Sequence, residues 1–403
     1  MNITAGYEGM AKLLEHVSGF IYPNEIEVHW SILIVVYPYL TGLVAGAFIL
    51  ASLVKVFNVT ALKPTYRLAL LTALAFLIIA PLPLLLHLGH PLRAWQIFFT
   101  PNLSSAMAMF GFVYAWYLMV VLLLEIWFDY RADLVNWGRT AKFPMNWFYQ
   151  ILSLFSKDVS PKAVAFDMKM VKYITILGIP SAFILHGYVG FIFGSIKANP
   201  WWSSVLIPIV FLFSAIVSGI ALVMLLYMII IPSRGQPIDM KCLDKIASFL
   251  LIAVIVDFSL EILDFTHRLY ESEESIKIIT EMVMNKLFIS LVVLQILIGM
   301  IVPLGILIIT KLAKFNQELR KLLYFVTAIL IQIGIFSTRW NVVLGGQMFS
   351  KSYRGLISYN MEIFGQEGFL MALALLIAPC IILAILIKIF PPWGKEKQRL
   401  KRI

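Results

Sequence analysis

Nine long apolar runs constrain the fold of this 403-residue chain more than any other feature. A helix needs about 20 apolar residues to cross a hydrocarbon core ~30 Å thick. Only 13% of the residues are charged, against about 25% in soluble domains. The chain is therefore predicted to be an all-α polytopic membrane protein with nine transmembrane helices, a tenth being the alternative. The runs lie near residues 31–56, 68–88, 105–129, 171–195, 203–232, 246–266, 284–310, 321–338 and 367–390.

The basic residues indicate how the chain is oriented. If the N-terminus is outside, the inner segments hold 23 of the 32 lysines and arginines. Positive charge favours the cytoplasmic side, so we expect the C-terminus in the cytoplasm and a multi-pass location in the cytoplasmic membrane. Membrane sidedness then explains the net charge of +10 without a nucleic-acid partner. Residues 1–28 lack the pattern of a cleaved signal peptide.

The sequence gives little indication that this chain binds a redox centre of its own. Cys242 and Cys380 lie in different runs and form no CxxC pair, so we expect no disulfide framework and no iron–sulfur cluster here. Transmembrane haem is held between histidines on facing helices, and no run carries a well-separated pair, which disfavours haem. Any cluster would have to belong to a partner protein.

A polar junction follows the second run, in the segment LLLHLGHPLRAWQIFFTPNLSSAM. It places His87, His90, Arg93 and Ser105 against the membrane boundary, where such groups are costly unless they have a function. The alternatives are that Arg93 serves docking and that the serines cap the next helix. All six histidines lie on the predicted outer side or in the outer half of a run, which favours a shared outer site over an ordinary interfacial preference: His16, His29, His87, His90, His186 and His267.

Three further polar residues lie within apolar runs. His186 and Tyr188 are two positions apart in ILHGYVGFIFG, so they point about 200° apart on a helix. Either could hydrogen-bond a quinone carbonyl, while Tyr188 could equally be an interfacial aromatic. The Tyr37 hydroxyl needs a partner inside the first run, which favours a functional role for it.

An acidic row lies in the sixth run. Asp257, Glu261 and Asp264 have the i, i+4, i+7 spacing of one helix face. Such a row suits a proton relay or an ion path. The alternative is structural pairing with Arg339, Arg268 or Arg93. Arg339 is predicted to end the eighth run at the outer face, either as a boundary anchor or as the counter-charge of this row.

Two patterns concern packing rather than chemistry. Gly42 and Gly46, like Ser214 and Ser218, are small residues four apart, which favours close helix contact. The stretch MNWFYQILSLF in the inner segment 130–170 is amphipathic and predicts a surface helix. An interfacial helix over 5–22 or 146–156 is the alternative to a further span.

The apolar and polar motifs together resemble the NrfD/PsrC family of polysulfide reductase membrane subunits. The matching segments are HWSILIVVYPYLTGLVAGAFILASL, LLLHLGHPLRAWQIFFTPNLSSAM and HGYVGFIFGSIKANPWW, and they occur in the family's order. The segment RWNVVLGGQMFSKSYRGL is similar to the longer, DsrP-like or HybB-like branch with extra C-terminal helices.

The resemblance implies a fold and a function. The fold would be two four-helix bundles plus an extra C-terminal helix. The chain would carry no haem or iron–sulfur cluster, and it would exchange electrons between menaquinone or another quinone and a ferredoxin-like iron–sulfur subunit on the outer face. Further partners would be of cytochrome, molybdopterin or hydrogenase type, in a complex of anaerobic respiration or sulfur metabolism. Quinone oxidoreductase activity would then belong to the complex.

The resemblance also assigns residues. The family's quinone tyrosine in the YxG segment corresponds to Tyr188, and the polar position of the first span to Tyr37. His87 stands where relatives commonly have an acidic or polar residue, so the protonation chemistry there stays open. The predicted quinone site comprises Tyr37, His87, His90, Arg93, Ser105, His186 and Tyr188. The predicted proton-transfer set comprises Asp257, Glu261, Asp264 and Arg339.

The sequence predicts four parts along the chain. They are an outer segment 1–28, a first bundle 29–195 with the quinone site, a second bundle 196–340, and a part 341–403 with an outer loop, the last span and a basic tail. Two other functions stay open at this point: an ion or anion transporter without a redox role, and a passive membrane anchor.

Overall fold

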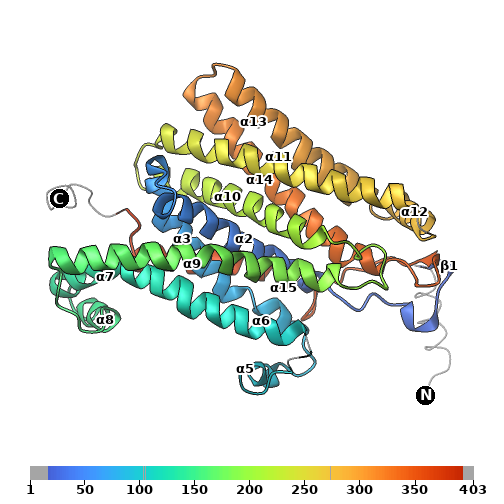
Figure 1. The fold of residues 1–403 in the computed structure, drawn as a ribbon, viewed down its shortest axis with the longest axis horizontal. Coiled ribbons are helices and arrows are strands. Elements are labelled where there is room, and N and C mark those ends of the chain that lie inside the picture. The colour runs from blue at the N-terminus through green and yellow to red at the C-terminus, as the bar shows by residue number, and fades with distance from the viewer. Residues whose placement is uncertain (1–16, 103, 105, 273, 394–403) are drawn as a thin grey trace.

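The computed structural model describes residues 17–102, 104, 106–272 and 274–393. Within these ranges, nine helices are long and apolar enough to cross a membrane, which confirms the predicted all-α polytopic class. Figure 1 shows the long helices running side by side, with β1 (Ser18–Phe20) and α12 (Ile276–Asn285) at one end. Helix α8 (Met145–Leu152) lies at the other. We call these the β end and the α8 end.

The spans form two groups that follow chain order. The first group consists of α2 (Ile32–Lys55), α3 (Lys63–Ile79) with α4 (Leu82–His87), α6 (Ala106–Ala115) with π-helical η4 (Trp116–Leu122) and α7 (Leu123–Thr140), and α9 (Pro161–Gly194). The second consists of α10 (Ile207–Ser233), α11 (Met240–Glu271), π-helical η5 (Phe288–Ile301) with α13 (Val302–Leu312), and α14 (Gln317–Val343). The ninth span, α15 (Phe369–Ile389), packs against α3 and α2.

Short elements complete the chain at the two ends of the helices. They are η1 (Pro23–Glu25), η2 (Thr60–Leu62), η3 (Pro91–Arg93), α5 (Gln96–Phe99), η6 (Gly345–Gln347) and β2 (Arg354–Leu356). Strands β1 and β2 pair antiparallel, with Ser18 opposite Leu356 and Phe20 opposite Arg354. This pairing ties the segment before the first span to the loop after the eighth. Because residues 18–20 form a strand, the alternative of an interfacial helix over 5–22 is wrong for the described part of that segment.

Polar caps define several helix starts. The side chains of Ser31, Ser160 and Asn316 each accept a backbone N–H from the first turn of α2, α9 and α14. Asp239 does the same for α11. These residues satisfy donors that have no partner inside a helix. The second span breaks at Pro81, so its last turns form the separate helix α4, which carries His87.

Glycines bring the two groups of helices together. A Cβ on Gly46 of α2 would lie 2.1 Å from the Ala215 carbonyl oxygen of α10, and one on Gly219 would lie 2.4 Å from Gly46. Only glycine fits there, which confirms the close packing predicted at Gly46. Glycines also allow close packing within the second group. A Cβ added to Gly299 of η5 would lie 2.3 Å from the Cα of Gly334 on α14.

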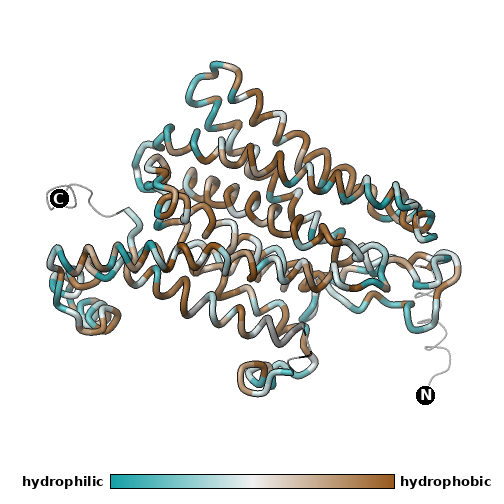
Figure 2. The backbone as a smooth tube through the Cα atoms, viewed as in Figure 1, coloured by the Kyte–Doolittle hydropathy of each residue, from teal (hydrophilic) through white to brown (hydrophobic). Residues whose placement is uncertain are grey.

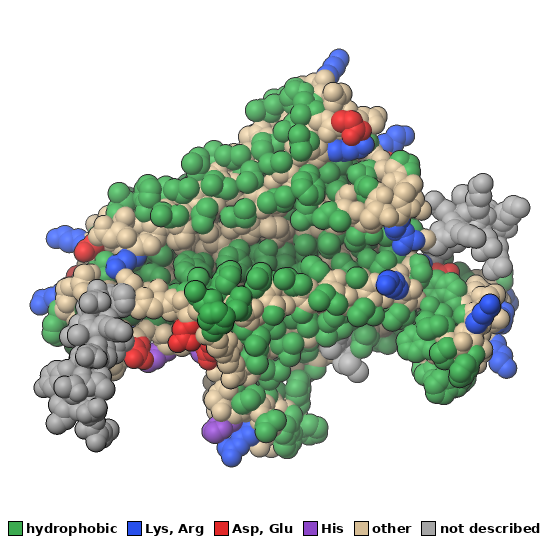
Figure 3. Space-filling view, turned by 180° about the vertical axis from the view of Figure 1, so that it is seen from behind, with side chains coloured by type: hydrophobic (Ala, Val, Ile, Leu, Met, Phe, Trp, Pro, Cys, Tyr) green, Lys and Arg blue, Asp and Glu red, His purple; other side chains and the backbone are tan. Residues whose placement is uncertain are grey.

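The surface agrees with a membrane protein. Figure 2 shows hydrophobic residues along the helices and hydrophilic ones toward the two ends. In Figure 3, apolar side chains form a broad band while charged ones gather mainly at its ends. The amphipathic helix predicted near residues 145–155 is confirmed as α8, which leaves Trp147 exposed together with the following Leu154 and Phe155.

The eighth span differs from its predicted limits. Helix α14 continues to Val343, so Arg339 lies inside the helix rather than at its end. Arg339 is fully buried, so the predicted end of the span at this residue is wrong, and so is the alternative that Arg339 is an ordinary boundary anchor. The reason is tertiary: polar groups from three other spans surround the guanidinium and allow the helix to continue past it.

Candidate functional site

Two predicted quinone residues lie at one apolar cluster near the β end. Tyr37 of α2 is buried and belongs to this cluster. Tyr188 of α9 and Leu84 of α4 are partly buried and pack against it. The first, second and fourth spans thus each contribute a residue, and we call Tyr37, Tyr188 and Leu84 the tyrosine wall.

His87 ends α4 and has a partner that the sequence did not indicate. Its Nδ1 lies 2.8 Å from Oε2 of Glu367, in the loop that leads into α15. Gln366 donates to the Leu86 carbonyl at 2.7 Å and fixes this loop against the end of α4. Both partners of the pair are partly open, with side-chain exposures of 25% for His87 and 37% for Glu367. The pair is therefore accessible from its surroundings.

The remaining junction residues lie further out. His90 and Arg93 are exposed, and neither side chain makes an ion pair within the described residues. The same loop exposes Leu92, Trp95 and Phe99 and projects from the helices together with α5 (Figure 1). The structure does not bring His90 or Arg93 against the tyrosines. Ser105, like His16, lies outside the described residues.

His186 lies between the two groups of helices. Arg339 Nη2 donates to His186 Nε2 at 3.2 Å, so this ring nitrogen is the acceptor. The proton is then on Nδ1, which faces Thr41 Oγ1 at 3.3 Å. The Thr41 hydroxyl donates to the Tyr37 carbonyl at 3.1 Å. As the spacing predicts, His186 and Tyr188 have different neighbours. His186 connects α2 to Arg339 instead of lining the tyrosine wall.

Arg339 is buried with few direct partners. It donates to Ser214 Oγ at 2.7 Å and lies 4.1 Å from the centre of the Phe211 ring. Its Nε and Nη1 atoms have no hydrogen-bond partner among the described residues. A buried charge needs an opposite charge. The carboxyl groups nearby are those of Asp257 and Glu261 on α11, and neither forms a direct ion pair with Arg339 among the described residues.

The acidic row divides into a fully buried pair and a partly buried third residue. Asp257 and Glu261 are buried, and each has one carboxylate oxygen without a hydrogen-bond partner in the described chain. Asp264 instead forms an ion pair with Arg268 at 2.9 Å and accepts a hydrogen bond from Ser204. The structure thus gives Asp264 structural partners, and a proton-transfer role for Asp257, Glu261 and Arg339 stays a prediction.

A polar chain continues from Glu261 across three helices. Gln295 of η5 donates to Glu261 Oε2 at 2.8 Å and accepts from Asn341 of α14 at 2.7 Å. A cavity of about 50 Å³ adjoins Glu261, Gln295 and Asn341 and also reaches Asp264 and Arg268. That volume holds one or a few water molecules. Glu261 is thus linked to the β end by polar groups and space for water.

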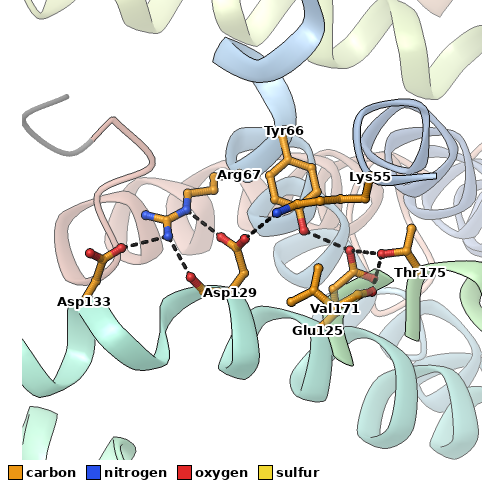
Figure 4. A network of polar contacts seen from close by, with 8 residues as sticks. All are labelled: Lys55, Tyr66, Arg67, Glu125, Asp129, Asp133, Val171 and Thr175. Atoms are coloured by element: carbon orange, nitrogen blue, oxygen red, sulfur yellow. Dashed lines mark hydrogen bonds and ion pairs between the residues drawn. The ribbon is translucent and has the colours of Figure 1, made fainter. Parts of the chain in front are cut away.

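A second buried network lies toward the α8 end (Figure 4). Asp129 of α7 accepts from Arg67 at 2.6 Å and from Lys55 at 2.9 Å, and Arg67 also pairs with Asp133 at 2.8 Å. One turn earlier, the fully buried Glu125 accepts a hydrogen bond from Thr175 at 2.8 Å. None of these residues was among the predicted sites.

Some of these partners left a signal in the sequence. Gln295 is the one amide within the apolar stretch Phe288–Ile301, and such a residue in a span has to find a polar partner. Glu125 and Asp129 stand in LLLEIWFDYRADL, which resembles the charged end of a span. Glu367 stands in a polar loop, and nothing in the sequence links it to His87 across 280 positions.

Comparison with known proteins agrees with this fold. Residues 23–351 match the model of the family described as polysulphide reductase, NrfD. The chain is 29% identical over 387 residues to a subunit of the selenate reductase of Mesobacillus selenatarsenatis, which covers 92% of this chain and 87% of the relative. It is 27% identical over 199 residues to protein NrfD of Escherichia coli, covering 49% and 58% of the two chains.

The chain is therefore a polytopic membrane protein of the class that serves reductase complexes. It belongs to the NrfD polysulphide reductase family, which confirms the resemblance drawn from its motifs. The choice between DsrP-like and HybB-like branches stays a prediction.

Proposed function

We propose that this chain is the quinone-interacting membrane subunit of a respiratory reductase complex. The electron donor is menaquinol or another quinol. A ferredoxin-like iron–sulfur subunit bound at the β end receives the electrons. Further redox subunits of cytochrome, molybdopterin or hydrogenase type complete the complex. A relative is named as a subunit of a selenate reductase, and this supports electron flow from quinol to a terminal reductase rather than from a partner to quinone.

The observation that carries this proposal is the His87–Glu367 pair. Glu367 accepts a hydrogen bond from Nδ1 of His87. Nε2 is then the ring nitrogen that can take up a proton. Oxidation of a quinol releases two electrons and two protons, so its site needs a proton acceptor at the ring oxygen. A carboxylate behind an imidazole orients the ring and stabilises its charged form, as in other proton-transfer sites.

The tyrosine wall gives the second half of the proposed site. Tyr37, Tyr188 and Leu84 share one apolar cluster, which suits the flat, apolar ring of a quinone. The phenol hydroxyls supply hydrogen bonds for its oxygens. Under this proposal the β end faces the outside of the cytoplasmic membrane, as the basic residues predict, and the exposed loop around α5 contacts the iron–sulfur partner.

We further propose that Asp257 and Glu261 carry protons for this site, with Arg339 as the fixed positive charge beside them. The hydrogen bonds from the Tyr37 carbonyl through Thr41 and His186 to Arg339 support a link between the two predicted sets. The cavity that extends from Glu261 to Asp264 supports a path by which these protons leave toward the β end. The protons then leave on the side at which the quinol is oxidised.

The test is binding of a quinol analogue to the purified complex. His87→Ala and Tyr188→Phe each remove one hydrogen-bonding group, so we expect affinity to fall about tenfold in both, the effect of ~1.4 kcal/mol. Tyr173→Phe, on an exposed part of the same helix α9, is the matched control. Unchanged affinity in His87→Ala and Tyr188→Phe would refute the site. Solute uptake by liposomes holding this chain alone would favour the transporter instead.

A further inference from the structure

A second cavity lies at the α8 end, far from the proposed quinone site. It has a volume of about 220 Å³ and is formed by the first turns of α11, the last turns of α13 and the first turns of α14. Its polar lining residues are Asp244, Ser248, Thr310, Lys311, Arg320 and Tyr324. This space holds several water molecules or one compact polar group.

The donors that face this cavity suit an anion. Arg320 Nη1 binds Asp244 Oδ2 at 2.7 Å, and Tyr324 donates to the other oxygen of Asp244 at 3.0 Å. These bonds satisfy the carboxylate and hold the guanidinium in place. The Arg320 Nε atom is buried and has no hydrogen-bond partner among the residues that the structure describes. The guanidinium as a whole is part-exposed, lines the cavity and is held in place by Asp244 as a donor group.

The charge of the cavity is positive. Asp244 offsets Arg320, whereas Lys311 makes no ion pair among the described residues. Lys245 and Lys314, both exposed, stand on the neighbouring turns of α11 and in the loop before α14. One uncompensated ammonium, one fixed guanidinium donor and this basic surround favour a ligand with negative charge.

Apolar side chains are exposed on the helix ends that form the cavity. Ile309 and Leu312 of α13 are exposed, as are Leu322 of α14 and Ile252 of α11. These residues belong to the same helix ends as the polar lining. An amphiphile could therefore place a charged group in the cavity and acyl chains along the helices. Basic pockets between transmembrane helices on the cytoplasmic side are suited to anionic head groups.

We propose that this cavity binds a phosphate group, that of an anionic lipid head group or of free phosphate, through Arg320 and Lys311. The site would fix the contact among α11, α13 and α14 at the end opposite the quinone site. It is independent of the redox proposal, because none of its residues takes part in that site.

The experiment uses the delipidated full-length complex in detergent and native mass spectrometry. The probes are cardiolipin, phosphatidylcholine and inorganic phosphate. Retention of cardiolipin over phosphatidylcholine, without competition by millimolar phosphate, identifies the lipid. Competition by phosphate identifies a site for the free anion, and both results support a phosphate site.

Two variants locate the binding. Lys311→Gln leaves the Asp244–Arg320 pair intact, and we expect it to weaken retention about fivefold. Lys314→Gln removes a neighbouring charge that does not line the cavity and should change retention less than twofold. Absence of binding by all three probes would overturn the proposal, as would equal losses in the two variants.

Discussion

The two buried polar networks of this protein differ in how completely their charges are paired. Toward the α8 end, Arg67, Lys55 and Asp129 form direct ion pairs of 2.6–2.9 Å. Around Arg339, by contrast, no direct ion pair joins the guanidinium to Asp257 or Glu261 in the described part of the chain, and atoms of all three residues have no hydrogen-bond partner there. In the α8-end network only Oε2 of Glu125 has no such partner. Direct ion pairs hold helices together, whereas an unsaturated network of buried charges can take up a proton or water.

The largest effect on stability is expected where pairing is complete. Arg67→Ala leaves the buried Asp129 with Lys55 alone, and removing one partner of a buried pair costs about 3–5 kcal/mol. The thermal unfolding midpoint of the detergent-solubilised chain should fall accordingly. Arg139→Ala, which removes an exposed arginine of α7, is the control and should change the midpoint little. Equal midpoints for the two variants would contradict the structural role of this network.

The largest effect on turnover is expected in the unsaturated network. Glu261→Gln keeps a group that can bond Gln295 but cannot carry a proton. Positioned proton transfer contributes about 10²-fold or more, so quinol oxidation by the complex should fall about 10²-fold while the unfolding midpoint stays unchanged.

Glu125→Gln is the matched control for this comparison. Glu125 is as deeply buried as Glu261, and each has one oxygen without a hydrogen-bond partner among the described residues. Glu125 lies outside the proposed proton path, and an amide oxygen can replace the one that accepts from Tyr66 and Thr175. Turnover should stay within about twofold of the parent, since a hydrogen-bond acceptor is retained. A loss as large as that of Glu261→Gln would remove the distinction between the two networks.

A smaller effect is expected at the pair that orients His87. Glu367→Gln keeps an acceptor for Nδ1 but removes the negative charge behind the imidazole. Loss of one charge-assisted bond, about 1.5 kcal/mol, predicts a roughly tenfold lower quinol oxidation rate. Glu362→Gln, an exposed residue of the same loop, should have no effect. Equal rates in both variants would show that Glu367 is only a surface contact.

The smallest effect concerns the start of the first span. The Tyr359 hydroxyl accepts the Ile32 N–H at 3.0 Å, and burial raises the pKa of Tyr359, which keeps the phenol neutral. Tyr359→Phe should lower the free energy of unfolding by about 1 kcal/mol. The difference from the parent should be independent of pH across the neutral range. A pH-dependent loss would show that another group acts at this helix start.

The fold was largely predictable because span length and hydropathy are local properties. Each of the predicted runs is long enough to cross a bilayer, and small residues such as Gly46 mark where helices approach closely. The limits of α14 were not predictable. Arg339 resembles the end of a span until Ser214, His186 and two carboxylates from other helices are brought around it.

The placement of the candidate site residues was predictable only in part. Tyr37 and Tyr188 lie at one apolar cluster, because their motifs are on helices α2 and α9, which pack together. That these residues bind quinone stays a prediction. Glu367 is 280 positions from His87, and only the packing of α15 beside α3 and α4 brings them into contact. His90 and Arg93 remain on the exposed loop, where the sequence alone could not separate them from His87.

Photoaffinity labelling with an azido-quinone tests the proposed quinone site most directly. The label is applied to the purified complex, with and without excess quinol, and the modified residues are located by peptide mass spectrometry. We predict quinol-protected labels at the β end, on α2 near Tyr37, on α4 near His87 and on α9 near Tyr188. Protected labels confined to the α8 end or to the second group of helices would contradict the proposed site.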